Sequence, residues 1–231
     1  MPTMEATHGG DQALAPVALG ASGRAVLLAC GIVSSILYVA TDILGGLRYP
    51  GYSFTSQAIS ELMAIGAPSE SFVDPLFIIY GVLLLAFALG VFREGAVCGR
   101  ALRAAGALLM GNAIIGLTGP TLFEMHRRGA TSGASDTLHI VLTAALVLST
   151  LLAIGFAAFA LGTRFRRYSL ATLVTMIALG VATVPYGVRL AANEPTPGFG
   201  IVERAIIYSS LLWIAVLASA LLRHPRHQEN Q

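Results

Sequence analysis

The amino-acid sequence predicts an all-α integral membrane protein, a bundle of six transmembrane helices with both chain ends in the cytoplasm. Two observations on composition support this class. Hydrophobic residues make up 55% of the 231 residues and charged residues only 11%, whereas a soluble chain carries about 25% charged residues. The third observation is a pattern along the chain. Six apolar stretches are close to the length of about 20 residues that a helix needs to cross a bilayer.

Each apolar stretch is expected to be a helix, because backbone exposed to lipid must satisfy its own hydrogen bonds. We expect one transmembrane domain over 24–223, between a disordered cytoplasmic tail over 1–23 and a second such tail over 224–231. The predicted spans are 25–43, 75–92, 102–119, 138–161, 169–190 and 205–222.

The distribution of charge predicts the orientation, because cytoplasmic loops carry an excess of arginine and lysine. With the N-terminus inside, nine arginines fall on the cytoplasmic side and five on the outer side, while the acids divide four to eight. We therefore expect a multi-pass protein of a bacterial cytoplasmic membrane, with the lipid bilayer as its first partner. The basic residues form short clusters and no continuous basic face, so no nucleic-acid partner is predicted.

The first outer connection, residues 45–72, is too long for a simple turn. Within it, Ala58, Ile59, Leu62 and Met63 recur at helical spacing after a segment rich in serine and threonine. This pattern predicts a short amphipathic helix, which either lies on the membrane or folds back over the bundle.

Ionisable side chains gather at the predicted outer ends of the helices. A charged residue inside or at the edge of a span is costly, and it is therefore a candidate functional residue. Because these side chains share one membrane depth, we expect the bundle to collect them into an outer polar cup. Its principal members are Asp42, Ser60, Glu61, His139, Glu203 and Arg204, with Glu124, His126, Asp136 and Arg189 nearby.

One interpretation of this cup is a metal site in a metal-dependent intramembrane hydrolase that acts on a lipid-like substrate. Zinc accepts imidazole and carboxylate ligands and keeps a position open for water in catalytic sites. The predicted ligands are Asp42, His139 and a glutamate, either Glu203 or Glu61. The sequence contains no HExxH or CxxC motif, and its two cysteines form neither a disulfide framework nor a metal motif.

The same hypothesis predicts Ser60, Glu61, His139 and Arg204 as catalytic residues. Ser60 would orient the substrate or attack it. The guanidinium of Arg204 would hold a lipid-like or anionic small molecule at the outer face, since its fork matches phosphate and carboxylate.

A second interpretation is that the charges of the cup are structural ion pairs. Asp42 would then pair with Arg204, and Arg189 with Glu203. Asp136 would cap the fourth helix at its positive end, and His139 would donate a hydrogen bond between helices. The polar residues in the inner halves of the spans are few and uncharged, which counts against proton pumping. A small-solute transporter and an accessory membrane subunit remain as further alternatives, and the activity is unassigned.

Several short motifs resemble the opening of a bacterial and archaeal membrane protein family catalogued as domain of unknown function 998. They are Asp42, the run Tyr49-Pro50-Gly51-Tyr52, the run Ile59-Ser60-Glu61-Leu62 and Gly66-Ala67-Pro68, with His139 and the segment Gly200 to Arg204 farther along. The resemblance covers the chain from about Arg24 to Leu222. It implies a six-helix membrane fold, and it supplies no catalytic residue.

Overall fold

A computed structural model describes residues 20–130, 133–192 and 194–224. The described chain folds into six long helices and one short one. All six long helices are long and apolar enough to cross a membrane, which confirms the predicted all-α class. The elements are α1 (Ala21–Arg48), η1 (Ile59–Met63), α2 (Glu70–Cys98), α3 (Arg100–Leu122), α4 (Ala134–Ala157), α5 (Thr163–Ala191) and α6 (Phe199–Arg223).

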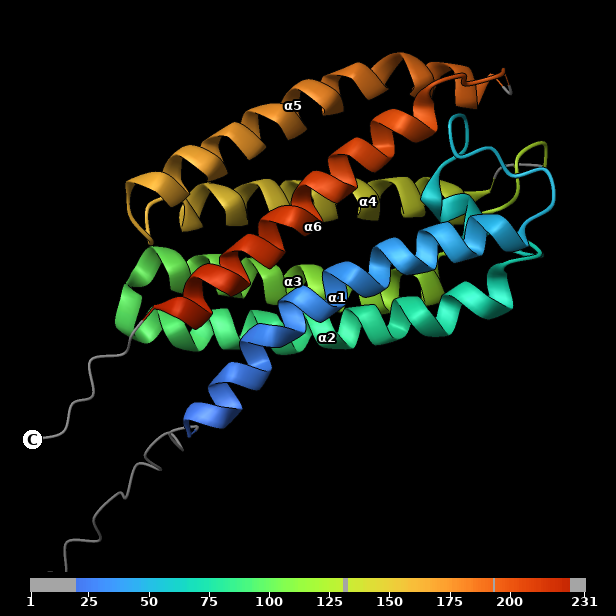
Figure 1. Ribbon diagram of the computed structural model, residues 1–231. Helices are drawn as coiled ribbons and strands as arrows, with labels where there is room; N and C mark the ends of the chain where they lie inside the picture. Colours follow the sequence, from blue (N-terminus) through green and yellow to red (C-terminus); the bar gives the residue numbers. More distant parts are fainter. Residues whose placement is uncertain (1–19, 131–132, 193, 225–231) are drawn as a thin grey trace, which may run out of the picture.

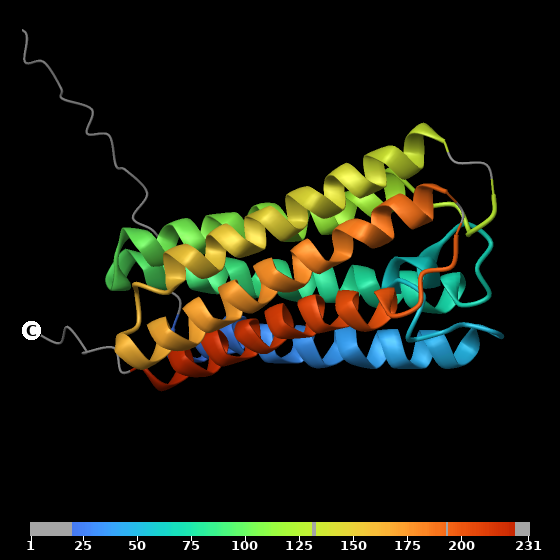
Figure 2. The ribbon, with the colours of Figure 1, turned by 90° about the horizontal axis from the view of Figure 1, so that it is seen from above.

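The six helices form a ring in which each helix packs against the next one in sequence, and α6 closes the ring against α1. Figures 1 and 2 show the resulting elongated bundle. We call one end the basic end, where α1 begins, α6 ends and the turns at 99 and 158–162 lie. The other end is the cap end, where the described parts of the connections 49–69, 123–133 and 192–198 lie. The predicted terminal tails lie largely outside the described residues.

The helices generally extend beyond the predicted spans, because a helical backbone is satisfied at headgroup depth as well as in hydrocarbon. The second helix begins at Glu70 rather than at residue 75, and the sixth begins at Phe199 rather than at residue 205. The fourth helix ends at Ala157, four residues before the predicted boundary. The chain turns there, and Gly162 adopts a φ of 86° that favours glycine.

The core is densest in the half of the bundle near the basic end. Phe87 and Trp213 are fully buried there, and the indole of Trp213 donates a hydrogen bond to Ser169 on α5 at 3.0 Å. Between α3 and α4, the amide of Asn112 donates to the carbonyl of Leu146 at 2.8 Å and lies within hydrogen-bond distance of two α4 hydroxyls. These polar contacts fix helix pairs at a depth where lipid offers no alternative partner.

Helices α4 and α5 separate toward the cap end, where α5 rises away from α4 (Figure 1). The exposure of α4 shows the same change. Ile154, near the basic end, is completely buried, whereas Val147 and Thr143, two and three turns away on the same face, are exposed. The half of the bundle near the cap end is therefore held together mainly by α1, α2, α3 and α6 and by the loops.

The predicted amphipathic helix of the first loop is the 3₁₀ helix η1, only five residues long. Its apolar residues point into the protein. Ile59 is 2% exposed and Leu62 is fully buried, and both pack in a small cluster with Val73 of α2. Of the two predicted placements, the structure therefore has the one in which this segment folds back over the bundle.

Candidate functional site at the cap end

Asp42 and Arg204 form a buried ion pair between α1 and α6. The Nε and Nη2 atoms of Arg204 donate to the two carboxylate oxygens of Asp42 at 2.9 and 2.8 Å. Tyr208, one turn farther along α6, donates its hydroxyl to Asp42 Oδ2 at 2.6 Å. Asp42 is 0% exposed and Arg204 is 9% exposed. The predicted pairing of these two residues is confirmed.

Arg204 also holds the first loop in place. Its Nη1 atom donates to the carbonyls of Phe54 and Gln57, both at 2.9 Å, and Nη2 donates to the hydroxyl of Tyr52 at 2.6 Å. Burial raises the pKa of Tyr52 above its usual range. The Tyr52 hydroxyl therefore stays protonated and donates onward to the carbonyl of Ala58 at 2.7 Å. All three guanidinium nitrogens of Arg204 are engaged within the protein.

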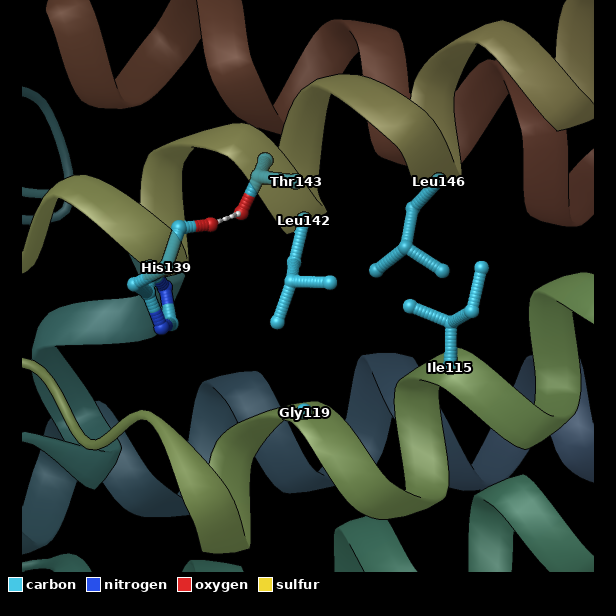
Figure 3. Close-up of a pocket in the computed structure, with 6 residues that line it drawn as sticks. All are labelled: Ile115, Gly119, His139, Leu142, Thr143 and Leu146. Carbon is cyan, nitrogen blue, oxygen red and sulfur yellow. Dashed lines mark hydrogen bonds between the residues drawn. The ribbon is translucent and has the colours of Figure 1, made fainter. Parts of the chain in front are cut away.

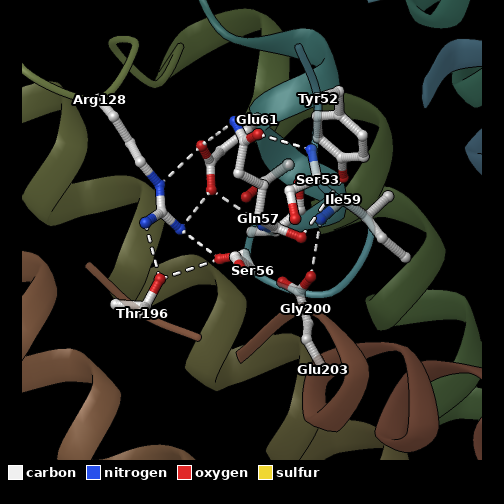
Figure 4. A network of polar contacts seen from close by, with 12 residues as sticks. Tyr52, Ser53, Ser56, Gln57, Ile59, Glu61, Arg128, Thr196, Gly200 and Glu203 are labelled. Carbon is white, nitrogen blue, oxygen red and sulfur yellow. Dashed lines mark hydrogen bonds and ion pairs between the residues drawn. The ribbon is translucent and has the colours of Figure 1, made fainter. Parts of the chain in front are cut away.

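A second ion pair joins Glu61 of η1 to Arg128 of the second loop (Figure 4). The Nε and Nη2 atoms of Arg128 each donate to one oxygen of Glu61 at 2.8 Å. The same carboxylate accepts from the side chain of Gln57 at 2.9 Å and from the backbone N–H of Ala58 at 2.8 Å. Each oxygen of Glu61 therefore accepts two hydrogen bonds.

Arg128 extends this network to the third loop, as Figure 4 shows. Its Nη1 atom donates to the hydroxyl of Thr196 at 2.7 Å, and its Nη2 atom donates to the carbonyl of Ser56 at 3.0 Å. Thr196 in turn donates to the same Ser56 carbonyl at 2.9 Å. One guanidinium thus connects the three loops of the cap end. We call the whole arrangement the polar cap: Asp42, Tyr52, Gln57, Glu61, Arg128, Thr196, Arg204 and Tyr208.

Glu203 does not pair with Arg189, so that part of the ion-pair prediction is wrong. The Oε2 atom of Glu203 accepts the backbone N–H of Ile59 at 2.7 Å. Among the described residues no ion pair involves Arg189, whose side chain is exposed at the end of α5. Glu203 binds the first loop instead, because that loop folds back over the start of α6 and brings an unpaired N–H to the carboxylate.

Ser60 and His139, predicted as catalytic residues, each contact a different residue. The hydroxyl of Ser60 contacts the sulfur of Met125 at 3.7 Å. His139 places Nδ1 3.2 Å from the carbonyl of Phe123, at the end of α3, where it acts as the donor. His139 also lines a recess of about 30 Å³ between α3 and α4 (Figure 3), whereas pockets for drug-sized ligands hold about 300 Å³ or more.

Asp136 caps α4, as predicted. Its Oδ2 atom accepts the backbone N–H of Gly133 at 2.8 Å, and Oδ1 accepts the backbone N–H of His126 at 2.8 Å. The imidazole Nδ1 of His126 lies 2.9 Å from Asp136 Oδ2. Asp136 thus fixes both the start of α4 and the preceding loop.

Each of the three predicted metal ligands has a different partner within the protein. Asp42 is bound by Arg204, Glu203 by the first loop, and His139 by the end of α3. In the part of the chain that the structure describes, no three His, Cys, Asp or Glu side chains are placed so that they could share a metal ion. The zinc hypothesis therefore has no support in this geometry.

Sequence reasoning missed several members of the polar cap. From the sequence, Arg128 is only one of the five outer arginines, and no polar role is predicted for Gln57, Thr196 or Tyr208. Tyr52 was noted only as part of the Tyr-Pro-Gly-Tyr run. No spacing rule relates Arg128 to Glu61, which lie 67 residues apart, so the sequence held no direct signal of this pair.

The described chain has six helices that are long and apolar enough to cross a membrane, and ion pairs join the helices and loops at one end. These features define a multi-pass membrane protein. The sequence model of the family described as "Protein of unknown function (DUF998)" matches residues 32–220. The chain belongs to this family, which confirms the resemblance seen in the sequence. Searches among curated proteins and among solved structures gave no match.

Proposed function

We propose that this protein is a non-catalytic membrane component, an accessory subunit that presents a preformed face of loops to a partner. The observation that carries the proposal is the saturation of the polar cap. Arg204 and Asp42 bind each other and the first loop, and Glu61 and Arg128 bind each other and the other loops. The hydrogen bonds and ion pairs of these side chains are therefore made within the protein.

Substrate binding at Arg204 would have to displace its present partners. Separating a buried pair leaves an uncompensated charge and costs about 3–5 kcal/mol. Asp42 is completely buried. Water therefore could not take the place of Arg204 beside Asp42, or of Asp42 beside Arg204, unless the cap opened. A catalytic arginine of the predicted hydrolase needs donors that face a substrate, and Arg204 directs its donors to protein acceptors.

The polar cap suits a docking role because the described residues of its three loops are already tied together. Contacts from Arg128 tie the second loop to the first and to the third, and a backbone hydrogen bond from Ile65 to the carbonyl of Met125 at 2.9 Å adds another link. A partner that binds ordered loops avoids the entropic cost of ordering them, which strengthens binding.

The proposal is tested first at the exposed surface of the cap. Ile65 is 40% exposed, and Arg127 is exposed on the neighbouring loop. We expect Ile65→Asp with Arg127→Glu to leave thermal unfolding in detergent nearly unchanged. On native gels of gently solubilised membranes, the parent is expected to migrate as a larger complex, and the double variant should lose it. A parent protein that migrates only as the isolated chain in such membranes would contradict the accessory role.

The competing enzyme hypothesis is tested with the same preparation. We expect no lipid or ester hydrolysis above that of Ser60→Ala and His139→Ala, the two substitutions that it singles out. Turnover by the parent that both variants abolish, with unfolding temperatures unchanged, would overturn the proposal in favour of a hydrolase.

A further inference from the structure

The two ends of the bundle differ in how many of their arginines have an acidic or aromatic partner within the protein. At the cap end, Arg204 and Arg128 form ion pairs. Arg48 lies 3.7 Å above the ring of Phe72, and Arg127 lies 5.7 Å from the ring centre of Tyr49. Arg189 is the exception in the described part of that end. The other four arginines described at that end each have an acidic or aromatic partner within the protein, and of these Arg48 and Arg127 are themselves exposed.

The basic end leaves its arginines exposed. Among the described residues of this end, only Arg24 is committed to an ion pair, with the buried carboxylate of Glu94 at 2.9 Å. Glu94 is also the only acidic residue of the described basic end, and it is 3% exposed. Seven further arginines are exposed there, of which Arg103 alone has an aromatic partner, the ring of Phe92 at 4.7 Å. They are Arg93, Arg100, Arg103, Arg164, Arg166, Arg167 and Arg223.

The start of α5 concentrates this charge. Arg164, Arg166 and Arg167 all lie within its first five residues, and no acidic residue occurs in its first turn. Arg164 and Arg167, three residues apart, share one side of the helix. The positive end of the helix dipole raises the local potential further, so cations at this position are unfavourable unless an anion compensates them.

We propose that this arginine cluster of α5 binds the phosphate headgroup of an anionic phospholipid. The cluster stands where a membrane-long helix begins, and a helix of that length places its ends at the depth of lipid headgroups. Below it the exposed side chains Leu170 and Val174 continue the surface into the hydrocarbon region. Guanidinium groups match phosphate in shape and remain charged. The charge, the depth and the apolar continuation together favour a lipid over a soluble anion.

The test compares the full-length protein in a neutral detergent with added phosphatidylglycerol, phosphatidylcholine or inorganic phosphate. Phosphatidylglycerol is expected to raise the unfolding temperature by several degrees, and native mass spectrometry should detect it as a retained adduct. The triple variant Arg164→Gln, Arg166→Gln and Arg167→Gln should lose most of both effects. A matched control, Arg48→Gln with Arg127→Gln and Arg189→Gln, makes the same change of charge at the cap end.

Each outcome decides the proposal. Loss of the lipid effect in the α5 variant, with the effect kept in the control, supports it. Equal stabilisation by inorganic phosphate would assign the cluster to a soluble anion and overturn the choice of a lipid. Equal losses in both triple variants, or no effect of phosphatidylglycerol on the parent, would show that the cluster is not a lipid site.

Discussion

Arg204 contributes the largest share of the contacts at the cap end. Its guanidinium joins α6 to α1 through Asp42 and to the first loop through Tyr52 and two carbonyls. A lysine could supply the charge but not the five fixed donors of the fork. Position 204 therefore requires an arginine for the geometry of its donors as well as for its charge.

Substitution of Asp42 by asparagine is expected to destabilise the protein strongly. The change leaves Arg204 charged and buried without its counter-ion, which costs about 3–5 kcal/mol. Thermal unfolding in detergent measures the effect. Arg189→Gln is the matched control, because that arginine is exposed and makes no ion pair among the described residues. Equal unfolding temperatures for the two variants would contradict the structural role of the pair.

Gly200 is required by the close approach of the first loop to α6. A Cβ atom at this position would lie 2.5 Å from the carbonyl oxygens of both Phe54 and Gln57, and backbone atoms cannot easily move away. We expect Gly200→Ala to cost about 1–3 kcal/mol and to weaken the contacts of Arg204 with the loop. The corresponding change at Gly116, where a Cβ meets nothing within 4 Å, should leave the unfolding temperature nearly unaltered.

At the scale of elements, side-chain contacts connect η1 to the second and third loops. The Glu61 carboxylate and the Arg128 guanidinium connect them, and Glu61 is 4% exposed. Arg128 keeps about a third of its side-chain surface exposed, at 31%. The pair is therefore partly screened by water, and its contribution to global stability is smaller than that of the Asp42 pair.

Glu61→Gln should loosen the loops more than it destabilises the bundle. The amide cannot accept the paired donors of Arg128 as a carboxylate does, so the fork loses its partner. Hydrogen exchange should become faster in 53–61 and 123–130, with little change in the protected core around Trp213. Unchanged exchange in both loops would show that the Arg128 contacts do not order them.

The whole molecule is a ring of six helices that begins and ends at the basic end. An even number of spans brings both ends of the described chain to the same side. Most of the exposed arginines in the described chain lie on that side, and the positive-inside rule predicts that this side faces the cytoplasm. The family to which the chain belongs carries no assigned activity in its description.

The orientation can be measured with single cysteines in a Cys30→Ser, Cys98→Ser background. Thr163 is exposed at the basic end and Thr55 at the cap end. In intact cells a membrane-impermeant thiol reagent should label Thr55→Cys, whereas Thr163→Cys should react only after permeabilisation. The reverse pattern would place the basic end outside.

The sequence by itself determined the properties that depend on local composition and spacing. Apolar length predicted the six helices, and arginine counts distinguished the two ends. Asp136 was recognisable as a cap, because its acceptor lies close in the chain to the N–H group of Gly133. The Asp42 to Arg204 pair was also predicted, since both residues stood at span ends of equal depth and opposite charge.

Only the tertiary structure decided which polar groups meet at the cap. Glu203 also stood at a span end of suitable depth and charge, yet it binds Ile59 and not Arg189. Glu61 pairs with Arg128 across two loops. The physical reason is that loop positions are not constrained by membrane depth. Their partners depend on how the chain folds back, and that depends on long-range packing, such as that of Ile59 and Leu62 against α2.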